Sequence, residues 1–200
     1  MWDDPAVALV CAYLRINGYF TLSEFAVGVH TQKELQAITD LDVIALRLPT
    51  ATVDDSLGQV ESGLLTEIDP GLEVAEDRID VLFVEVKQGE VQFNPGMRQP
   101  ATLHAGLQRV GGRLGASAGA IAQALIATGR FESTKAQVRL MAVGSHGHVG
   151  RGASLTHAHL LDFVERHVQK NAGVLQAMQV GDPVVAFLEL AEKAKGHIPL

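Results

Sequence analysis

The sequence predicts an α/β protein with a mixed central sheet flanked by helices. Four runs rich in β-branched and aliphatic residues have the length of strands, at residues 19–30, 41–48, 80–87 and 136–144. Stretches with helical spacing precede the first run and follow the third and the fourth. The predicted order is therefore αβββααβαα, and we expect the 200 residues, 1–200, to form a single domain.

The first helix has clear signals at both ends. Asp4 is an N-cap candidate, Pro5 suits the first helical position, and Gly18 can adopt the left-handed conformation that ends a helix. Residues 19–30 then alternate as in a strand, and the polar stretch 32–40 is expected to be a connection. Apolar residues recur on one face of the helix: Val7, Val10, Cys11 and Leu14.

Two buried strands with a long excursion between them form the middle of the chain. Residues 41–48 are a β-branched and aliphatic run that Pro49 ends, and the next strand starts at Asp80. The excursion, residues 50–79, has mixed polarity and several glycines. We expect it to be a long connection and not a second domain.

The second half of the chain predicts helices on either side of the last strand. Two helical stretches, residues 100–114 and 117–128, come before that strand. An amphipathic helix follows it, with Ser154 or Thr156 as the cap. The final helix starts at the Asp-Pro pair 182–183, where the aspartate is a cap and the proline suits the first position.

The composition predicts a cytoplasmic protein with no membrane partner. Apolar residues make up 47% of the chain and charged residues 20%, as in ordinary globular proteins. The single cysteine, Cys11, allows no disulfide within the chain, which fits a reducing compartment. The first residues lack the basic segment of a secretory signal, and no apolar run approaches the roughly 20 residues that span a bilayer.

The net charge of −7 is divided unevenly along the chain. Residues 1–90 carry a net charge of −12 and residues 91–200 a net charge of +5. One interpretation is a metal site in the acidic half and a basic face in the other half. The alternative is an acidic surface loop, because residues 53–80 hold nine of the 17 acids in the first half.

Two charges interrupt the apolar run of the third strand. Glu85 and Lys87 lie two residues apart, so they share one face of the strand, roughly 6.6 Å apart along it. On the second strand Asp40 and Asp42 also share a face. If these strands are neighbours, Asp42 and Glu85 could meet at one sheet edge, and two carboxylates with a backbone carbonyl would suit Mg²⁺ or Mn²⁺. Lys87 would offset excess negative charge, hold a phosphate or orient a water molecule.

This pattern resembles the PD-(D/E)XK, or restriction-endonuclease-like, nuclease superfamily. The stretch TDLDVIALR is similar to the E-x-D strand of small uncharacterised members, with Asp40 where those have Glu, and VEVKQG is similar to their E-V-K-T-G. The resemblance covers residues 6–168 in order and implies a restriction-endonuclease-like core. It also implies that Asp42 and Glu85 are metal ligands, that Lys87 is the catalytic lysine, and that Asp40 and Gln88 are accessory.

The resemblance implies a Mg²⁺- or Mn²⁺-dependent enzyme that hydrolyses phosphodiester bonds in DNA. This chain departs from the pattern, because no proline precedes Asp42 and the excursion is long. The alternative is a catalytically inactive nuclease-fold module that binds nucleic acid or a partner protein. A further alternative is an oligomeric scaffold whose acidic excursion docks a partner. A homodimer or a complex with a partner subunit is compatible with each of these.

Basic residues and histidines elsewhere are weaker candidates. The pairs His146/His148 and His157/His159 suggest zinc, but the usual cysteine ligands are missing, and the second pair would point in different directions on a helix. Contact with phosphate, or plain surface, explains them better. Several arginines could line a nucleic-acid groove or form a solvated face: Arg98, Arg109, Arg113, Arg130, Arg139 and Arg151.

Overall fold

In the computed structural model, helices cover both faces of a six-stranded mixed sheet. The structure describes residues 4–30, 35–49, 65–111, 113–178 and 181–198. The elements in chain order are α1 (Pro5–Ile16), β1 (Phe20–His30), β2 (Leu35–Arg47), the short 3₁₀ helix η2 (Pro70–Leu72), β3 (Ile79–Val86), α2 (Pro100–Val110), α3 (Ala118–Thr128), β4 (Arg130–Glu132), β5 (Ala136–Gly144), β6 (Ala153–Thr156), α4 (His157–Met178) and α5 (Pro183–Lys195).

The sheet joins an antiparallel meander to a parallel pair of strands. Its order is β1-β2-β3-β5-β4, and β6 also pairs with β5. Strands β1, β2 and β3 are antiparallel, whereas β3 and β5 are parallel and are connected through α2 and α3. The short strands β4 and β6 lie on the far side of β5, β4 antiparallel to it and β6 parallel. The predicted mixed sheet with flanking helices is therefore present.

Two details of the predicted element order were wrong. Strand β2 already begins at Leu35, so much of the stretch expected to be a polar connection is paired with β1. The strands β4 and β6, three and four residues long, were not predicted. The helix expected with Ser154 or Thr156 as its cap is α4, which begins at His157; the hydroxyl of Thr156 accepts a hydrogen bond from the His159 N–H at 3.2 Å, so the second alternative is confirmed.

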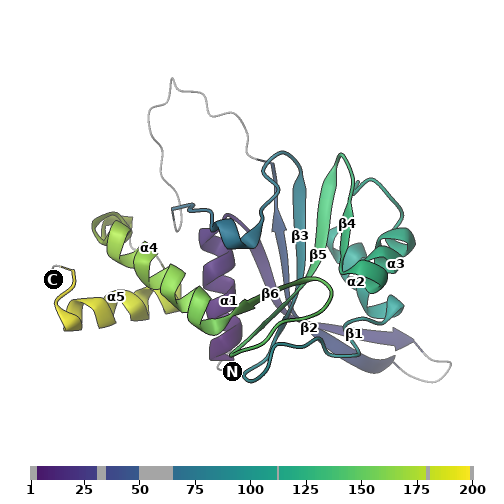
Figure 1. Cartoon of the computed structure of the whole chain (residues 1–200), viewed down its shortest axis with the longest axis horizontal. Helices are drawn as coiled ribbons and strands as arrows, with labels where there is room; N and C mark the ends of the chain where they lie inside the picture. The colour runs from purple at the N-terminus through teal and green to yellow at the C-terminus, as the bar shows by residue number, and fades with distance from the viewer. Residues whose placement is uncertain (1–3, 31–34, 50–64, 112, 179–180, 199–200) are drawn as a thin grey trace.

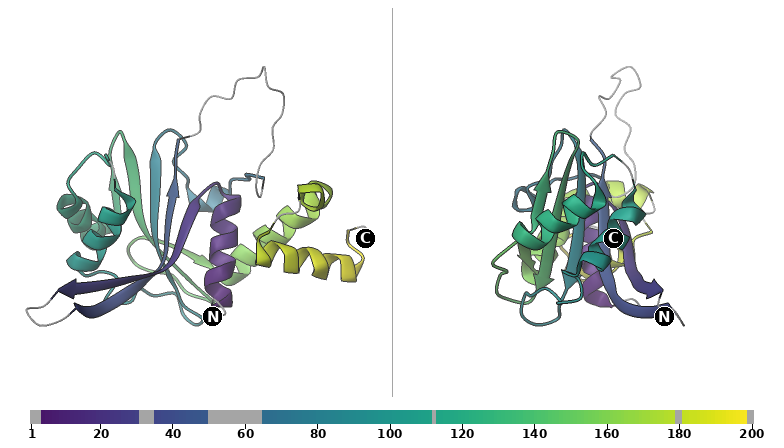
Figure 2. Two further views of the ribbon diagram at one scale, coloured as in Figure 1. Left: turned by 180° about the vertical axis from the view of Figure 1, so that it is seen from behind. Right: turned by 90° about the vertical axis from the view of Figure 1, so that its right-hand side faces the viewer.

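The helices form two layers, one on each face of the sheet (Figures 1 and 2). Helices α2 and α3 pack against one face, and α1, α4 and α5 lie on the other. Strand β3 contributes to both cores, because Leu82 and Val84 face α1 while Val81 and Phe83 face α2. Burial on both faces explains why this strand is an almost continuous apolar run.

The predicted helix caps are present. The Ala6 N–H donates a hydrogen bond to Asp4 Oδ1 at 2.8 Å at the start of α1, and Gly18 adopts a φ of +83° after its end. At the start of α5, Asp182 Oδ1 accepts hydrogen bonds from the N–H groups of the second and third helical residues. These local signals determine where α1 and α5 begin.

The described part of the excursion packs against α1 and α4. The hydroxyl of Tyr13 donates to Asp69 Oδ2 at 2.7 Å, and the Asp69 N–H donates to Asn17 Oδ1 at 2.7 Å. His159 on α4 contacts the same Asp69 oxygen at 2.5 Å. The first part of the predicted excursion, residues 50–64, lies outside the described residues.

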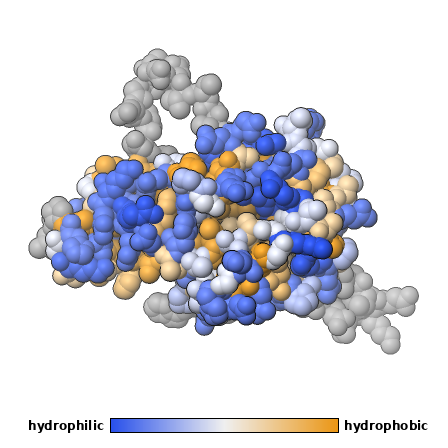
Figure 3. Space-filling view, in the orientation of Figure 1, coloured by the Kyte–Doolittle hydropathy of each residue, from blue (hydrophilic) through white to orange (hydrophobic). Residues whose placement is uncertain are grey.

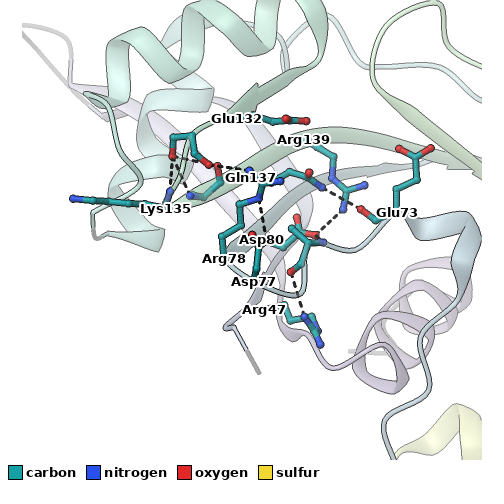
Figure 4. A network of polar contacts seen from close by, with 12 residues as sticks. Arg47, Glu73, Asp77, Arg78, Asp80, Glu132, Lys135, Gln137 and Arg139 are labelled. Atoms are coloured by element: carbon teal, nitrogen blue, oxygen red, sulfur yellow. Dashed lines mark hydrogen bonds and ion pairs between the residues drawn. The ribbon is translucent and has the colours of Figure 1, made fainter. Parts of the chain in front are cut away.

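A buried ion pair connects β3 to β5 beneath η2 (Figure 4). Asp80 is fully buried, and its Oδ2 accepts hydrogen bonds from Arg139 at 2.8 Å, from the Tyr19 hydroxyl at 2.8 Å and from the Ala75 N–H at 3.0 Å. Arg139 also donates to the carbonyl of Leu72 at 2.6 Å. The suggestion that Arg139 lines an exposed nucleic-acid groove was therefore wrong, because this side chain is part of the interior.

The surface shown in Figure 3 is mostly hydrophilic, with apolar residues in separate patches. Helices α4 and α5 extend away from the sheet (Figure 1). Among the described helices, none is by itself long and apolar enough to cross a bilayer, although α4 and α5 taken together as one bent pair pass that test by length and composition.

Candidate active site

The regular alternation of side chains between the two faces of the sheet is interrupted at Glu24 on β1 and at Asp42 on β2. Side chains two residues apart normally share one face of a strand. On β2, however, Val43 packs in the core with α1, whereas Leu41 packs in the core with α2. Glu24 has a φ of +53°, and the pairing of β1 with β2 omits Glu24 and Asp42. The strands therefore twist sharply here, and Asp42 lies at the point of the twist.

The register of β2 and β3 places Asp42 beside Glu85. The regular pairing of these antiparallel strands ends at Val43 and Val84, so Asp42 and Glu85 are the next residue on each strand. Instead of a backbone partner, the N–H of Val86 donates a hydrogen bond to Asp42 Oδ2 at 2.7 Å. The side chain of Asp42 thus replaces a backbone acceptor of the sheet, which fixes its carboxylate at the end of β3.

Glu85 and Lys87 form an ion pair at the same place. The carboxylate of Glu85 is almost completely buried, and Lys87 Nζ donates to its Oε1. The side chain of Lys87 is 31% exposed, so its ammonium lies at the boundary between the site and solvent. A buried carboxylate with a partly exposed ammonium can offer both charges to a ligand that approaches the end of β3.

Both carboxylates have a raised pKa. Burial raises the pKa of Glu85, and the nearby charges of Asp42 and Asp40 add to this, while the hydrogen bond from Lys87 opposes it. Burial likewise raises the pKa of Asp42 against the hydrogen bond from Val86 and the charge of Lys87. Negative charge is thus concentrated in a poorly solvated position, which a bound cation would stabilise.

Asp4 is a further member of this cluster that the sequence did not reveal. Its Oδ2 accepts a hydrogen bond from Gln88 Nε2 at 3.3 Å, and its charge contributes to the raised pKa of Asp42. In the sequence Asp4 has only the pattern of a helix cap. Its proximity to the site depends on where α1 begins relative to the end of β3, and no local pattern encodes that. The predicted accessory residues, Asp40 and Gln88, are both exposed at the margin of the cluster.

The residues present fit a hard divalent cation that binds through few protein ligands. Within the described part of the chain, no three or more His, Cys, Asp or Glu side chains form a group that could hold a metal ion. Mg²⁺, however, is usually bound through one or two carboxylates and keeps several waters or substrate oxygens. Asp42 and Glu85 provide two such carboxylates, so they are the residues that would hold Mg²⁺ or Mn²⁺.

The predicted arginines divide into two groups. Arg98 and Arg151 line the same groove, between the segment after β3 and the loop before β6. Arg98 donates to the Ile126 carbonyl at 2.8 Å, and its guanidinium lies 5.8 Å from the centre of the Phe93 ring. Arg109 and Arg113 are exposed and do not line that groove.

The histidine pairs do not converge. His159 contacts Asp69, and the Nε2 of His157 is buried without a hydrogen-bond partner among the described residues. In the segment that contains His146 and His148, the backbone of His146 forms an isolated parallel bridge with Glu90.

Together, the sheet and the carboxylate–lysine cluster define a mixed α/β protein with a candidate cation site at the end of its central strand. No protein-family model matches this chain, and no curated protein or solved structure matches it either.

Proposed function

We propose that this protein has a restriction-endonuclease-like core and is a metal-dependent nuclease that hydrolyses phosphodiester bonds in DNA. One observation carries the proposal: the register of β2 and β3 brings Asp42 next to Glu85, with Lys87 paired to Glu85. The order of one helix, three antiparallel strands, crossover helices and a parallel strand supports it.

In this proposal each side chain has a defined role. Asp42 and Glu85 hold the cation, whose chemistry is to acidify a bound water and to offset charge on a phosphoryl oxygen. Lys87 acts as a hydrogen-bond donor that orients the attacking water or holds the scissile phosphate, because its ammonium is partly exposed beside Glu85. Asp40 and Gln88, at the margin, help to position that water.

The groove that contains Arg98 and Arg151 supports DNA as the substrate. Its two walls follow the carboxyl ends of β3 and β5, which are parallel neighbours, so both walls leave the sheet at the end where Glu85 lies. Arg151 is exposed and Arg98 is partly exposed, and guanidinium groups supply sequence-independent contacts to phosphates. A DNA strand that lay in this groove would pass the arginines of residues 91–200, the basic half of the chain, and then reach the carboxylate–lysine cluster.

The test is DNA cleavage by the purified protein in Mg²⁺ or Mn²⁺, with a matched reaction in EDTA. Supercoiled, linear, single-stranded and branched DNA are offered, and we expect at least one to be cut only with the metal. Lys87→Ala and Glu85→Gln are expected to lower the rate by about 10²–10⁴. The matched controls Lys135→Ala and Glu76→Gln change exposed residues outside the cluster and should keep the wild-type rate. Metal binding without cleavage of any substrate would reject the nuclease and favour the inactive module.

A further inference from the structure

A cavity of about 370 Å³ lies on the opposite face of the sheet from Glu85. It is enclosed by η2, the turn between α3 and β4, strand β5, and β6 with the loop before it. Leu72 and Met141 in its wall belong to the core on the α1 side. Glu85 points to the other side, because its neighbours Val84 and Val86 pack against α1. The cavity is therefore separate from the candidate active site.

Three guanidinium groups line this cavity: those of Arg130, Arg139 and Arg151. Arg139 is only 4% exposed, and its terminal nitrogens are bound by the Leu72 carbonyl and Asp80. Its Nε–H is buried with no hydrogen-bond partner among the described residues. Asp80 Oδ1, on the same ion pair, is also buried without a partner among the described residues, so the Arg139–Asp80 pair forms a fixed, charged floor under the cavity.

The other two guanidinium groups belong to exposed residues. Arg130 and Arg151 are exposed, and Arg130 pairs with Glu132, which does not line the cavity. Glu73 is the acidic residue in the wall, and it is exposed at the rim, close to Arg139 (Figure 4). Three arginines and one acidic residue therefore line the cavity, and two of the arginines are paired with carboxylates outside its wall, Arg130 with Glu132 and Arg139 with Asp80.

Glycines form the part of the wall where β4 and β6 approach each other. Gly129 and Gly152 have φ angles of +80° and +93°. A Cβ atom on Gly129 would lie 2.3 Å from the Gly152 nitrogen, so the two backbones are in direct contact. Ser154 adds a hydroxyl to the same wall. A backbone without side chains lets an anion approach closely, as in other phosphate sites.

We propose that this cavity binds a small molecule that carries a phosphate group. Guanidinium groups recognise phosphate through paired N–H donors, and here the exposed Arg130 and Arg151 supply these donors above the buried Arg139–Asp80 pair. The cavity is larger than a bare phosphate and within the range of small-molecule sites. The apolar side chains of Leu72, Met141 and Leu155 then contact the organic part of the ligand. No step of this proposal depends on nuclease activity.

The experiment measures thermal unfolding with inorganic phosphate, and with sodium chloride at the same ionic strength as the control. At a phosphate concentration about 20-fold above its Kd, we expect Tm to rise by about 4–7 °C beyond the chloride control. The double variant Arg130→Ala/Arg151→Ala should lose this rise. The matched double variant Arg109→Ala/Arg113→Ala changes two exposed arginines outside the cavity and should keep it.

Two further comparisons identify the source of the phosphate. Adenosine 5′-monophosphate should bind at least about tenfold more tightly than adenosine, which lacks the phosphate. Lys87→Ala should retain the phosphate effect, which separates this site from the carboxylate–lysine cluster. Arg151 also lines the groove that contains Arg98, so Arg98→Ala, which lies outside the cavity, should retain the phosphate effect as well. The proposal is overturned if phosphate gives no rise beyond chloride, or if the Arg130/Arg151 variant keeps the rise. A third result would also overturn it: binding of an oligonucleotide without terminal phosphates that is lost in the Arg130/Arg151 variant, together with no effect of free phosphate. The two arginines would then bind the nucleic-acid backbone and not a small molecule.

Discussion

Replacing Asp80 with asparagine tests how the two halves of the sheet are held together. The side chain accepts hydrogen bonds from Arg139, Tyr19 and the Ala75 N–H in a position with no exposed surface. Burial raises the pKa of Tyr19, and the charge of Asp80 adds to this, so the tyrosine remains a neutral donor. Asp80→Asn keeps the shape of the side chain but leaves the charge of Arg139 buried without its counter-ion.

The size of the effect follows from this burial. Breaking a buried ion pair by removing one partner costs about 3–5 kcal/mol of folding free energy. For a chain of this length, 1 kcal/mol corresponds to roughly 2–4 °C in Tm, so we expect Asp80→Asn to lower Tm by about 6–20 °C.

The measurement is thermal or urea-induced unfolding followed by circular dichroism, with Asp77→Asn as the control. Asp77 is near Asp80 in sequence, but its side chain is 82% exposed and its ion pair with Arg78 spans 3.4 Å. Exposed pairs contribute about 0–1 kcal/mol, so the control should change stability very little. If the two variants are equally stable, Asp80 does not stabilise the buried arginine and the reasoning is refuted.

Three further predictions concern the excursion, the glycine contact and the metal. Burial would raise the pKa of Asp69, but hydrogen bonds from Tyr13, the Gly71 N–H and His159 outweigh it and lower the pKa. The contribution of ionised Asp69 to folding stability is therefore fully present above its pKa in the unfolded chain, about 3.9. It is lost as the pH falls through the lower pKa that Asp69 has in the folded protein. The Tm difference between wild type and Asp69→Asn should shrink as the pH is lowered from neutral to about 3. A difference that stays constant over this range would contradict the stabilising role of ionised Asp69. Gly129→Ala should cost at least about 2 kcal/mol in urea unfolding, because of its φ of +80° and the 2.3 Å contact; a wild-type midpoint would contradict this. Mn²⁺ at about 100-fold above its Kd should stabilise the wild type by about 2.7 kcal/mol and Asp42→Asn much less, and equal stabilisation would exclude Asp42 as a ligand.

The elements that could be predicted from the sequence are those with local signals. The start of α1 follows from Asp4 and Pro5, and the start of α5 from another Asp-Pro pair, because a cap and a proline act within one helical turn. Strand β3 was predictable because it is buried on both faces. The strands β4 and β6 were not, since they are three and four residues long and owe their conformation to pairing with β5.

In the candidate site, too, some residues could be placed from local sequence patterns and others could not. Glu85 and Lys87 are two residues apart on one strand, so the alternation of side chains was enough to place them together. The position of Asp42 depends on the twist of β2, and that of Asp4 on the packing of α1. Arg139 could not be distinguished from a surface arginine, because its partner Asp80 lies 59 residues away in the sequence. Contacts of this kind arise from the tertiary structure and leave no local pattern.

The rate of Mg²⁺-dependent DNA cleavage, measured side by side for the wild type and Lys87→Ala, tests the central claim most directly. Lys87 is partly exposed but is paired with the buried Glu85 carboxylate, so Tm is measured alongside, and the folded Lys87→Ala protein should cleave about 10²–10⁴ more slowly than the wild type. Equal cleavage rates for the two proteins, or no cleavage by the wild type on any form of DNA, would contradict the assignment of Asp42, Glu85 and Lys87 as the active site.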